Sequence, residues 1–243
     1  MKEKEIKMRL PALLPCVLFL AARFAAAKKD ISLQWAICEP NPQEALQKLG
    51  LGGTTPPYKE NPITYYDESP PVYLSEGLMF RTKTNKGQPL STVKTRFPDK
   101  TKNVPDFVEC SWDRYGDDIT YTCEKRCPLD PALHSVWCDE QVEFAERYED
   151  VDWSELTAYG PFSNAKWKLR LEGYKAKFDD VAAGSLHLME IEVQTQKSHS
   201  KKVYKSITRS LQDRGVVLCD PQEGKTMRLF REMGYFNGER SEL

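Results

Sequence analysis

The chain has 243 residues, of which 40% are hydrophobic and 29% are charged, and its formal net charge is −1. This composition supplies enough apolar residues for a core, and the charged fraction indicates a soluble protein. The net charge near zero argues against nucleic-acid binding through bulk positive charge. The length allows one large domain or two small ones.

Residues 1–27 have the pattern of a signal peptide. Basic residues come first, an apolar run covers residues 10–22, and three alanines at 25–27 supply a small-residue cleavage site. The apolar run is too short to span a bilayer comfortably, so we expect cleavage and no stable membrane span afterwards; an uncleaved anchor is the alternative. Residues 28–243 show no repeat or clear linker, and we predict one domain that is secreted or periplasmic. That domain is mildly acidic, so no nucleic-acid partner is expected.

Two strands and a helix precede the first basic segment. Residues 31–37 alternate between apolar and other side chains and predict a strand. Asn41 and Pro42 open a short helix that Gly50 ends as a C-cap residue. Residues 63–66 predict a second strand, which ends at Asp67.

Residues 77–97 predict a β-hairpin with cations gathered on one face. Side chains alternate along a strand, so Arg81 and Lys83 share one face, and Lys94 and Arg96 share one face of the return strand. A symmetric loop would place Arg81 opposite Arg96 and Lys83 opposite Lys94. Like charges directly opposite one another destabilise a sheet, so the grouping indicates an anionic ligand, best a row of phosphates. The alternative is a solvated basic face on an edge strand.

Residues 107–123 predict a second hairpin, centred on Gly116 and Asp117. Its register places Cys110 opposite Cys123. Removal of Cys16 with the leader leaves an even number of cysteines, which behind a signal peptide suggests disulfides. The other pairings stay open, and free buried thiols are the alternative. A zinc site is not expected, because no CxxC pair exists and the spacings are irregular. The remaining cysteines are Cys38, Cys110, Cys123, Cys127, Cys138 and Cys219.

The second half of the chain predicts further strands with charged faces between helices. Helices are expected at residues 139–156, 202–214 and 224–233, and strands at 165–174, 174–180, 185–195 and 216–219. Lys166, Lys168 and Arg170 share one face of their strand, and Glu190 and Glu192 share one face of theirs.

Charged faces backed by apolar faces fit a sheet that curls into a barrel with a polar interior. Carboxylates in such a lumen would hold Mg²⁺ or Mn²⁺, which prefer oxygen ligands. Cations would hold phosphate oxygens, and the metal would polarise the phosphoryl group. The alternative is a structural barrel whose charges lie outside in solvent.

Four segments of the chain carry a family resemblance. The segments YYDESPPVYLSEGLMFRTK and STVKTRF resemble a region of the CYTH superfamily, the triphosphate tunnel metalloenzymes that include thiamine triphosphatases. That region has a YYDT-like turn, an L-x-R-x-R strand and a strand with an inward Lys. The segment KWKLRLEGYKAKFDDVAAGSLHLMEIEV is similar to the family's closing strands, where an Asp precedes an E-x-E, and GKTMRLF matches weakly near the end. The resemblance spans most of residues 31–233.

The resemblance implies an α+β fold, with an eight-stranded antiparallel β-barrel, the triphosphate tunnel, and flanking helices over residues 28–243. It implies binding of a triphosphate-containing small molecule or inorganic polyphosphate together with Mg²⁺ or Mn²⁺. The phosphate-binding residues would be Arg81, Lys83, Lys94, Arg96, Lys166 and Lys225, and the metal ligands would be Asp179, Glu190 and Glu192.

The first strand departs from the family pattern. The E-x-E-x-K signature falls on Ser32, Gln34 and Ala36, so both carboxylates and the Lys are absent there. The segment EKEIK at residues 3–7 spells the signature, but it lies in the leader and would insert about 28 residues before the helix, so we reject it. A basic position of a later strand falls on Asn164, for which Lys166 on the same face can substitute.

These departures leave two functions open. The first is a metal-dependent triphosphatase with weakened metal binding. The second is a catalytically inactive, disulfide-braced binding or interaction module built on the same barrel.

Overall fold

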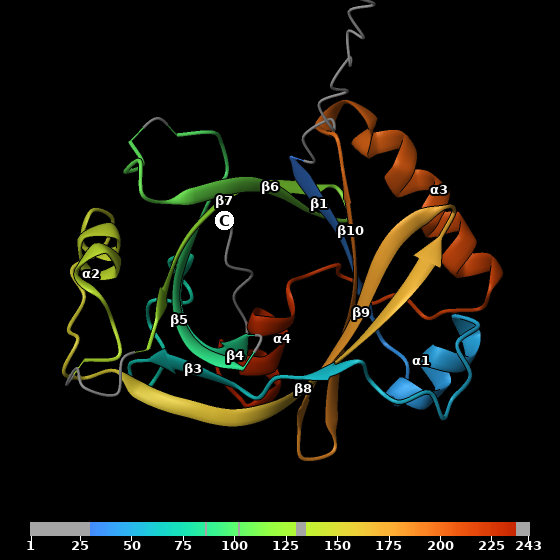
Figure 1. Cartoon of the computed structure of the whole chain (residues 1–243), viewed down its shortest axis with the longest axis horizontal. Coiled ribbons are helices and arrows are strands. Elements are labelled where there is room, and N and C mark those ends of the chain that lie inside the picture. Colours follow the sequence, from blue (N-terminus) through green and yellow to red (C-terminus); the bar gives the residue numbers. More distant parts are fainter. Residues whose placement is uncertain (1–29, 86, 102, 130–134, 237–243) are drawn as a thin grey trace, which may run out of the picture.

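A computed structural model describes residues 30–85, 87–101, 103–129 and 135–236 as a closed β-barrel with flanking helices (Figure 1). The predicted signal peptide, residues 1–27, lies outside the described residues. The order round the barrel is β8-β3-β4-β5-β7-β6-β1-β10-β9, and β9 pairs with β8 to close it. A further short strand, β2 (Lys59–Glu60), pairs with β8. The barrel strands are β1 (Ile31–Ile37), β3 (Ile63–Asp67), β4 (Leu78–Asn85), β5 (Gln88–Phe97), β6 (Glu109–Tyr115), β7 (Asp118–Pro128), β8 (Thr157–Leu171), β9 (Tyr174–Ala183) and β10 (Leu186–Thr195).

The barrel is confirmed, but its strand count and its uniform antiparallel pairing are corrected. Nine described strands close it instead of eight, and β1 and β6 run parallel, with Ile31 beside Trp112 and Gln34 beside Tyr115. All other neighbours in the barrel are antiparallel. The sequence pattern identifies a strand by its alternation, whereas the choice of neighbour is made by segments far apart in the chain.

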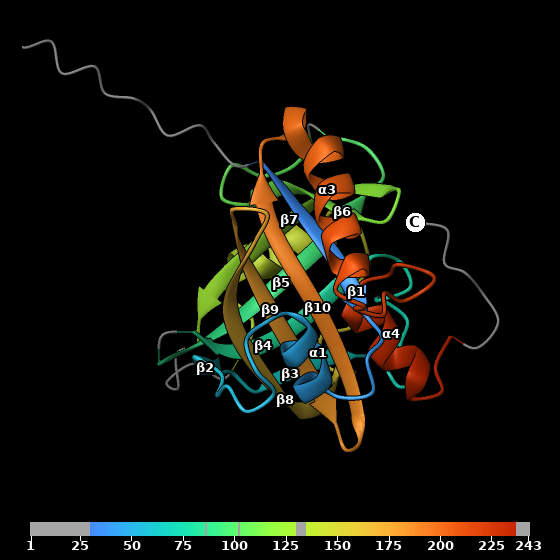
Figure 2. The same cartoon turned by 90° about the vertical axis from the view of Figure 1, so that its right-hand side faces the viewer.

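Strand β1 shows how the two faces of the barrel are divided. Leu33 and Trp35 point outward into the main core, under the helices α1 (Pro42–Lys48) and α3 (Ser200–Asp213). The Trp35 indole Nε1 donates to Thr208 Oγ1 of α3 at 2.8 Å. Ser32 and Gln34 alternate with these residues and therefore face the lumen. Figures 1 and 2 show α1 and α3 on the outside of the barrel, beside β1, β9 and β10.

Helix α4 (Lys225–Glu232) fills one end of the lumen with apolar side chains. Met227 and Phe230 pack with Tyr65, Met79 and Leu188, which lie on the lumen-facing sides of β3, β4 and β10. In Figure 1 the helix lies inside the outline of the barrel, and in Figure 2 it lies towards one end. The same faces of β4 and β10 continue with charged residues, so the lumen changes from apolar near α4 to charged along the strands.

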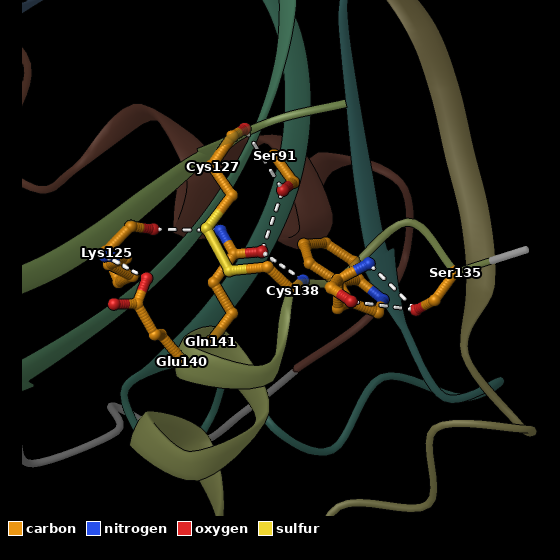
Figure 3. Close-up of a disulfide and its surroundings, with 8 residues drawn as sticks. Ser91, Lys125, Cys127, Ser135, Cys138, Glu140 and Gln141 are labelled. Carbon is orange, nitrogen blue, oxygen red and sulfur yellow. Dashed lines mark hydrogen bonds and ion pairs between the residues drawn. A yellow bond between two sulfur atoms is a disulfide. The ribbon is translucent and has the colours of Figure 1, made fainter. Parts of the chain in front are cut away.

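Helix α2 (Asp139–Glu146) is anchored to the outside of the barrel by a disulfide and a buried amide. Cys127 of β7 is bonded to Cys138, the residue before the helix (Figure 3). The Gln141 side chain donates to the Lys125 carbonyl oxygen at 3.0 Å and accepts from Ser91 Oγ at 2.8 Å. The helix also packs an apolar face against the barrel, because Phe144 and Ala145 are fully buried in the core cluster that includes Val93.

Two predicted elements are shorter than expected. The helix expected over residues 139–156 ends at Glu146, because the amides of Tyr148 and Glu149 both bond to the Ala145 carbonyl oxygen and so tighten the last turn. The strand expected over residues 216–219 is reduced to a single bridge between Ile37 and Leu218. Helix α3 is confirmed and follows the short 3₁₀ helix η1 (Lys197–His199).

None of the helices in the described part of the chain is both long and apolar enough to cross a bilayer.

Replacing Cys127 and Cys138 by alanine is expected to lower the free energy of unfolding by about 2 kcal/mol, because the crosslink closes a short loop. Amide hydrogen exchange should increase in α2, since the disulfide fixes the residue directly before its first turn, and should stay unchanged in α3. Equal protection of α2 in the variant and the wild type would contradict this prediction.

Candidate functional site in the barrel lumen

The hairpin β4–β5 places its cations in the lumen, but not opposite one another. The predicted faces are confirmed, whereas the predicted pairing was wrong: Arg81 pairs with Thr92, and Lys83 pairs with Leu90. The turn is tighter than a symmetric longer loop, with Gly87 at φ +81°, a conformation that suits glycine. The resulting stagger separates the like charges along the strands and reduces their repulsion.

Lys94 meets a carboxylate that the sequence interpretation had not assigned. Its ammonium lies 3.2 Å from Asp113 Oδ2 of β6, which also accepts from Thr122 Oγ1 at 2.9 Å. Burial lowers the pKa of Lys94 to about 8, with Arg96 and Arg81 acting in the same direction and Asp113 opposing them. The pKa of Asp113 is lowered: burial alone would raise it, but Lys94 and Arg96 outweigh burial.

Lys83 is surrounded by cations. Among the residues that the structure describes, no carboxylate oxygen lies within 4 Å of its ammonium. The charge of Arg81 and then burial, followed by Lys166, Arg126 and Lys225, lower the pKa of Lys83 to about 5. These neighbours belong to β4, β7, β8 and α4, so four elements direct cations to one region of the lumen. At neutral pH, Lys83 is therefore neutral in the empty lumen.

Asp179 of β9 and Glu190 of β10 lie next to each other and share the ammonium of Lys225. They are direct partners in the β9–β10 pairing, and Lys225 Nζ lies 2.9 Å from Glu190 Oε1 and binds Asp179 Oδ2 as well. Lys166 Nζ lies 3.5 Å from the same Asp179 oxygen, and Tyr115 OH donates to Glu190 Oε2 at 2.5 Å. Burial opposes the charged form of Lys225, but the two carboxylates raise its pKa well above the usual range.

Lys225 reaches the lumen because the segment before it is fixed to the end of β1. Cys219 is bonded to Cys38, which directly follows that strand. The Gln222 side chain donates to the Ala36 carbonyl oxygen at 3.0 Å and accepts from the Ala36 amide at 2.8 Å. These contacts hold the start of α4 at the wall of the lumen, and Lys225 is the first residue of that helix.

The third predicted metal ligand, Glu192, does not join Asp179 and Glu190. Its carboxylate lies 3.3 Å from Lys177 Nζ and retains 24% of its side-chain exposure, against 6% for Glu190. It lines a cavity of about 510 Å³ further from α4. The cavity lining is Lys168, Leu169, Arg170, Lys175, Ala176, Lys177, Glu192 and Gln194.

The side chains in this arrangement do not fit a divalent metal ion. Magnesium requires a nearly octahedral set of oxygen ligands, and calcium-like sites need more still. Asp179 Oδ2 and both Glu190 oxygens already accept bonds from Lys225, Lys166 and Tyr115. Within the described residues, only one group of at least three potential ligands lies close enough for a metal, and its two sulfur atoms form a disulfide. That group is Cys127, Cys138 and Glu140.

The sequence interpretation missed the second hairpin's contribution to the lumen. Asp113 and Tyr115 of β6 and Glu124 and Arg126 of β7 face inward, and Glu124 lies 3.7 Å from Arg81 Nη2 and binds Arg126. Every second residue over this part of β6 and β7 is polar, which was the available signal. The hairpin had been used only to pair the two cysteines that its outer face brings together.

The first-strand positions of the resemblance do lie in the lumen. The Gln34 side chain contacts the Tyr115 hydroxyl that donates to Glu190, and Ala36 pairs with Glu190 across β1 and β10. Ser32 is buried on the same face. These positions supply no carboxylate to the pair on β9 and β10.

Neither protein-family models nor curated protein sequences gave a match to the chain. Solved structures do match its fold. A candidate adenylate cyclase from Bacillus halodurans is 16% identical, with a TM-score of 0.57 over 83% of this chain and 97% of its own. A candidate adenylyl cyclase from Hippeastrum, for which a dominant triphosphatase activity is described, is 14% identical, with a TM-score of 0.52 over 83% of this chain and 95% of its own. The chain therefore has the barrel fold of these proteins.

Proposed function

We propose that the protein is a divergent, exported member of the CYTH superfamily that binds inorganic triphosphate, polyphosphate or a triphosphate-containing small molecule in the lumen. The observation that carries this proposal is the position of Lys83 among the inward cations Arg81, Lys166, Arg126 and Lys225. Those four cations have carboxylate partners, but no carboxylate of the described residues lies within 4 Å of the Lys83 amine. Grouped cations repel one another in an empty barrel, and a chain of phosphates removes that repulsion.

Unsatisfied donors near these cations support a ligand with several oxygen atoms. Arg81 Nε and Thr92 Oγ1 are buried without a hydrogen-bond partner in the described structure. A buried donor without a partner is unfavourable by about 1–3 kcal/mol. Arg81 and Thr92 are paired neighbours on β4 and β5, so a single phosphate group could accept from both.

Hydrolysis is the second candidate function. Asp179 and Glu190 meet, as the resemblance implied, and a triphosphatase activity is described for the structurally similar Hippeastrum protein. Against turnover stand the missing first-strand carboxylates and the position of Glu192 beside Lys177. The geometry therefore supports binding better than catalysis. Phosphate release that requires Mn²⁺ and disappears in Glu190→Ala would establish the enzyme.

Export is part of the proposal and is supported by the cysteines. All six cysteines of residues 28–243 form three disulfides, Cys38–Cys219, Cys110–Cys123 and Cys127–Cys138, the second as predicted. Disulfides persist in oxidising compartments. The three bonds support the proposed secreted or periplasmic location, and sequencing of the mature N-terminus would test the expected cleavage after Ala27.

Binding can be tested by thermal melting with tripolyphosphate in the presence of EDTA. A ligand that binds only the native state stabilises it by about 2.7 kcal/mol at a hundred times its Kd. We expect the double variant Arg81→Gln/Lys94→Gln to bind at least about 100-fold more weakly, because each lost charge-assisted contact is worth about 1.5–3 kcal/mol.

The control variant is Lys202→Gln, which removes an exposed cation from α3 outside the barrel. It should bind as the wild type does, and sulfate at matched ionic strength should give no comparable shift. An equal shift for the wild type and the double variant would exclude the lumen as the binding site.

A further inference from the structure

The pair of carboxylates on β9 and β10 already holds a cation that belongs to the protein. Lys225 Nζ contacts Asp179 Oδ2 and Glu190 Oε1 together, and the side chains of these two acids are only 5% and 6% exposed. A cation that bridges two adjacent buried carboxylates stands where a divalent ion would have to bind both. We propose that Lys225 acts as a tethered replacement for the metal, so that the lumen binds its phosphate chain without a divalent cation.

The charges of this cluster balance without a metal. Asp179 and Glu190 contribute two negative charges, and Lys225 and Lys166 contribute two positive charges within 4 Å of them. A divalent ion would find no net negative charge and would lie beside two ammonium groups. Both ammonium groups would repel that ion, since like charges in a partly buried site are weakly screened.

Lys225 is also held in place rather than loosely paired. Tyr115 occupies the second Glu190 oxygen, which leaves Oε1 for the ammonium. The Cys38–Cys219 disulfide and the bonds of Gln222 to β1 fix the chain just before Lys225. A fixed ammonium can contact phosphate oxygens and the two carboxylates together, which is the bridging contact that a metal ion otherwise supplies.

Direct measurement of Mn²⁺ binding by electron paramagnetic resonance tests this inference on the full protein. The wild type is expected to bind no stoichiometric Mn²⁺. Lys225→Met should bind one Mn²⁺ at least about tenfold more tightly than the wild type does, because the substitution leaves two buried carboxylates without their shared cation. Adding Asp179→Asn to Lys225→Met should remove the gained site. Lys202→Met, an exposed change of the same type on α3, should behave as the wild type does.

The wild-type measurement decides the matter even if Lys225→Met does not fold. A stoichiometric Mn²⁺ site in the wild type that Glu190→Gln abolishes would overturn the inference, as would a folded Lys225→Met that gains no Mn²⁺ site. If Lys225→Met folds only when Mn²⁺ is added, the inference is supported.

Metal-independent binding of tripolyphosphate is a consequence of this inference that rests on the proposed function. The experiments below distinguish a failure of the proposed function from a failure of the inference about Lys225. Wild-type affinity for tripolyphosphate should be the same in EDTA and in a metal-containing buffer after correction for metal bound by the free ligand. Lys225→Met should bind about tenfold more weakly in EDTA and recover with Mn²⁺. Absence of any tripolyphosphate binding would refute the proposed function, while a gained Mn²⁺ site in Lys225→Met would still support the tethered cation.

Discussion

The affinity of the wild-type barrel for tripolyphosphate is expected to fall by about tenfold for each pH unit as the pH rises above the pKa of Lys83, about 5 in the empty lumen. Bound phosphates counteract the charge of Arg81 and the other neighbouring cations, and so raise the pKa of Lys83. Between the two pKa values, Lys83 is neutral in the free protein and protonated in the complex. Binding therefore takes up a proton in this range, which makes it weaker at higher pH.

The same group should make the empty barrel less stable at neutral pH. The pKa of Lys83 is lowered on folding from its ordinary 10.5, so the unfolded chain binds more protons between that pKa and about 5. Above its unfolded pKa, Lys83 is neutral in both states and does not lower the stability of the fold. As the pH falls towards the folded pKa, the unfolded chain gains a proton that the folded protein does not, and the free energy of unfolding decreases. Lys83→Met is expected to raise the free energy of unfolding at pH 7 by about 1 kcal/mol or more while weakening anion binding.

Calorimetric titrations in buffers of different ionisation enthalpy measure the proton uptake directly. On binding tripolyphosphate near neutral pH, the wild type should take up close to one proton more than Lys83→Met. The affinity of Lys83→Met should therefore lack the tenfold fall for each pH unit that is expected for the wild type. Protonation of tripolyphosphate itself is common to both proteins and cancels in the comparison. Lys202→Met should keep the wild-type profile. Identical profiles for the wild type and Lys83→Met would show that Lys83 does not lie beside the ligand.

Sequence patterns that act within one strand or hairpin predicted which side chains share a face in the first hairpin. The alternation in residues 78–97 identified which side chains share a face, and the second hairpin's symmetry identified the Cys110–Cys123 pair. Side-chain direction follows from the pleat of the strand itself, so it needs no knowledge of the neighbouring strand. The register of β4 with β5 depended on the turn, and there the symmetric-loop assumption failed.

Features that depend on distant segments could not be derived in the same way. The parallel pairing of β1 with β6 joins residues about 80 positions apart, and the Cys38–Cys219 bond joins residues 181 positions apart. No local pattern encodes such a choice. The contact between Lys225 and the carboxylates depends on both the disulfide and the packing of α4 in the lumen.

The proposed binding site also depends on the turn after β3, which the sequence indicated by the end of a strand at Asp67 and by the YYDT-like segment of the resemblance. Asp67 is 2% exposed, and its Oδ1 accepts from the backbone amides of Val72 and Tyr73 at 2.8 and 2.9 Å and from that of the adjacent residue at 2.8 Å. Its Oδ2 accepts from the Leu74 amide at 2.9 Å. The carboxylate thus satisfies four backbone donors of residues 68–74. This ordered turn leads directly into β4, which carries Arg81 into the lumen.

Asp67→Ala is expected to lower the free energy of unfolding by about 4 kcal/mol, because four backbone amides, two of them on the buried residues Tyr73 and Leu74, lose their acceptor. Tyr73 packs edge-on against Phe80 at a centroid distance of 5.8 Å, so loosening the turn should also disturb β4. Asp67→Asn is the matched control, because it keeps one acceptor oxygen and the same shape. Its free energy of unfolding should fall by about half as much as that of Asp67→Ala. Denaturant unfolding of the three proteins measures the series. A loss below about 1 kcal/mol in Asp67→Ala would mean that the turn is held by its packing and not by the carboxylate.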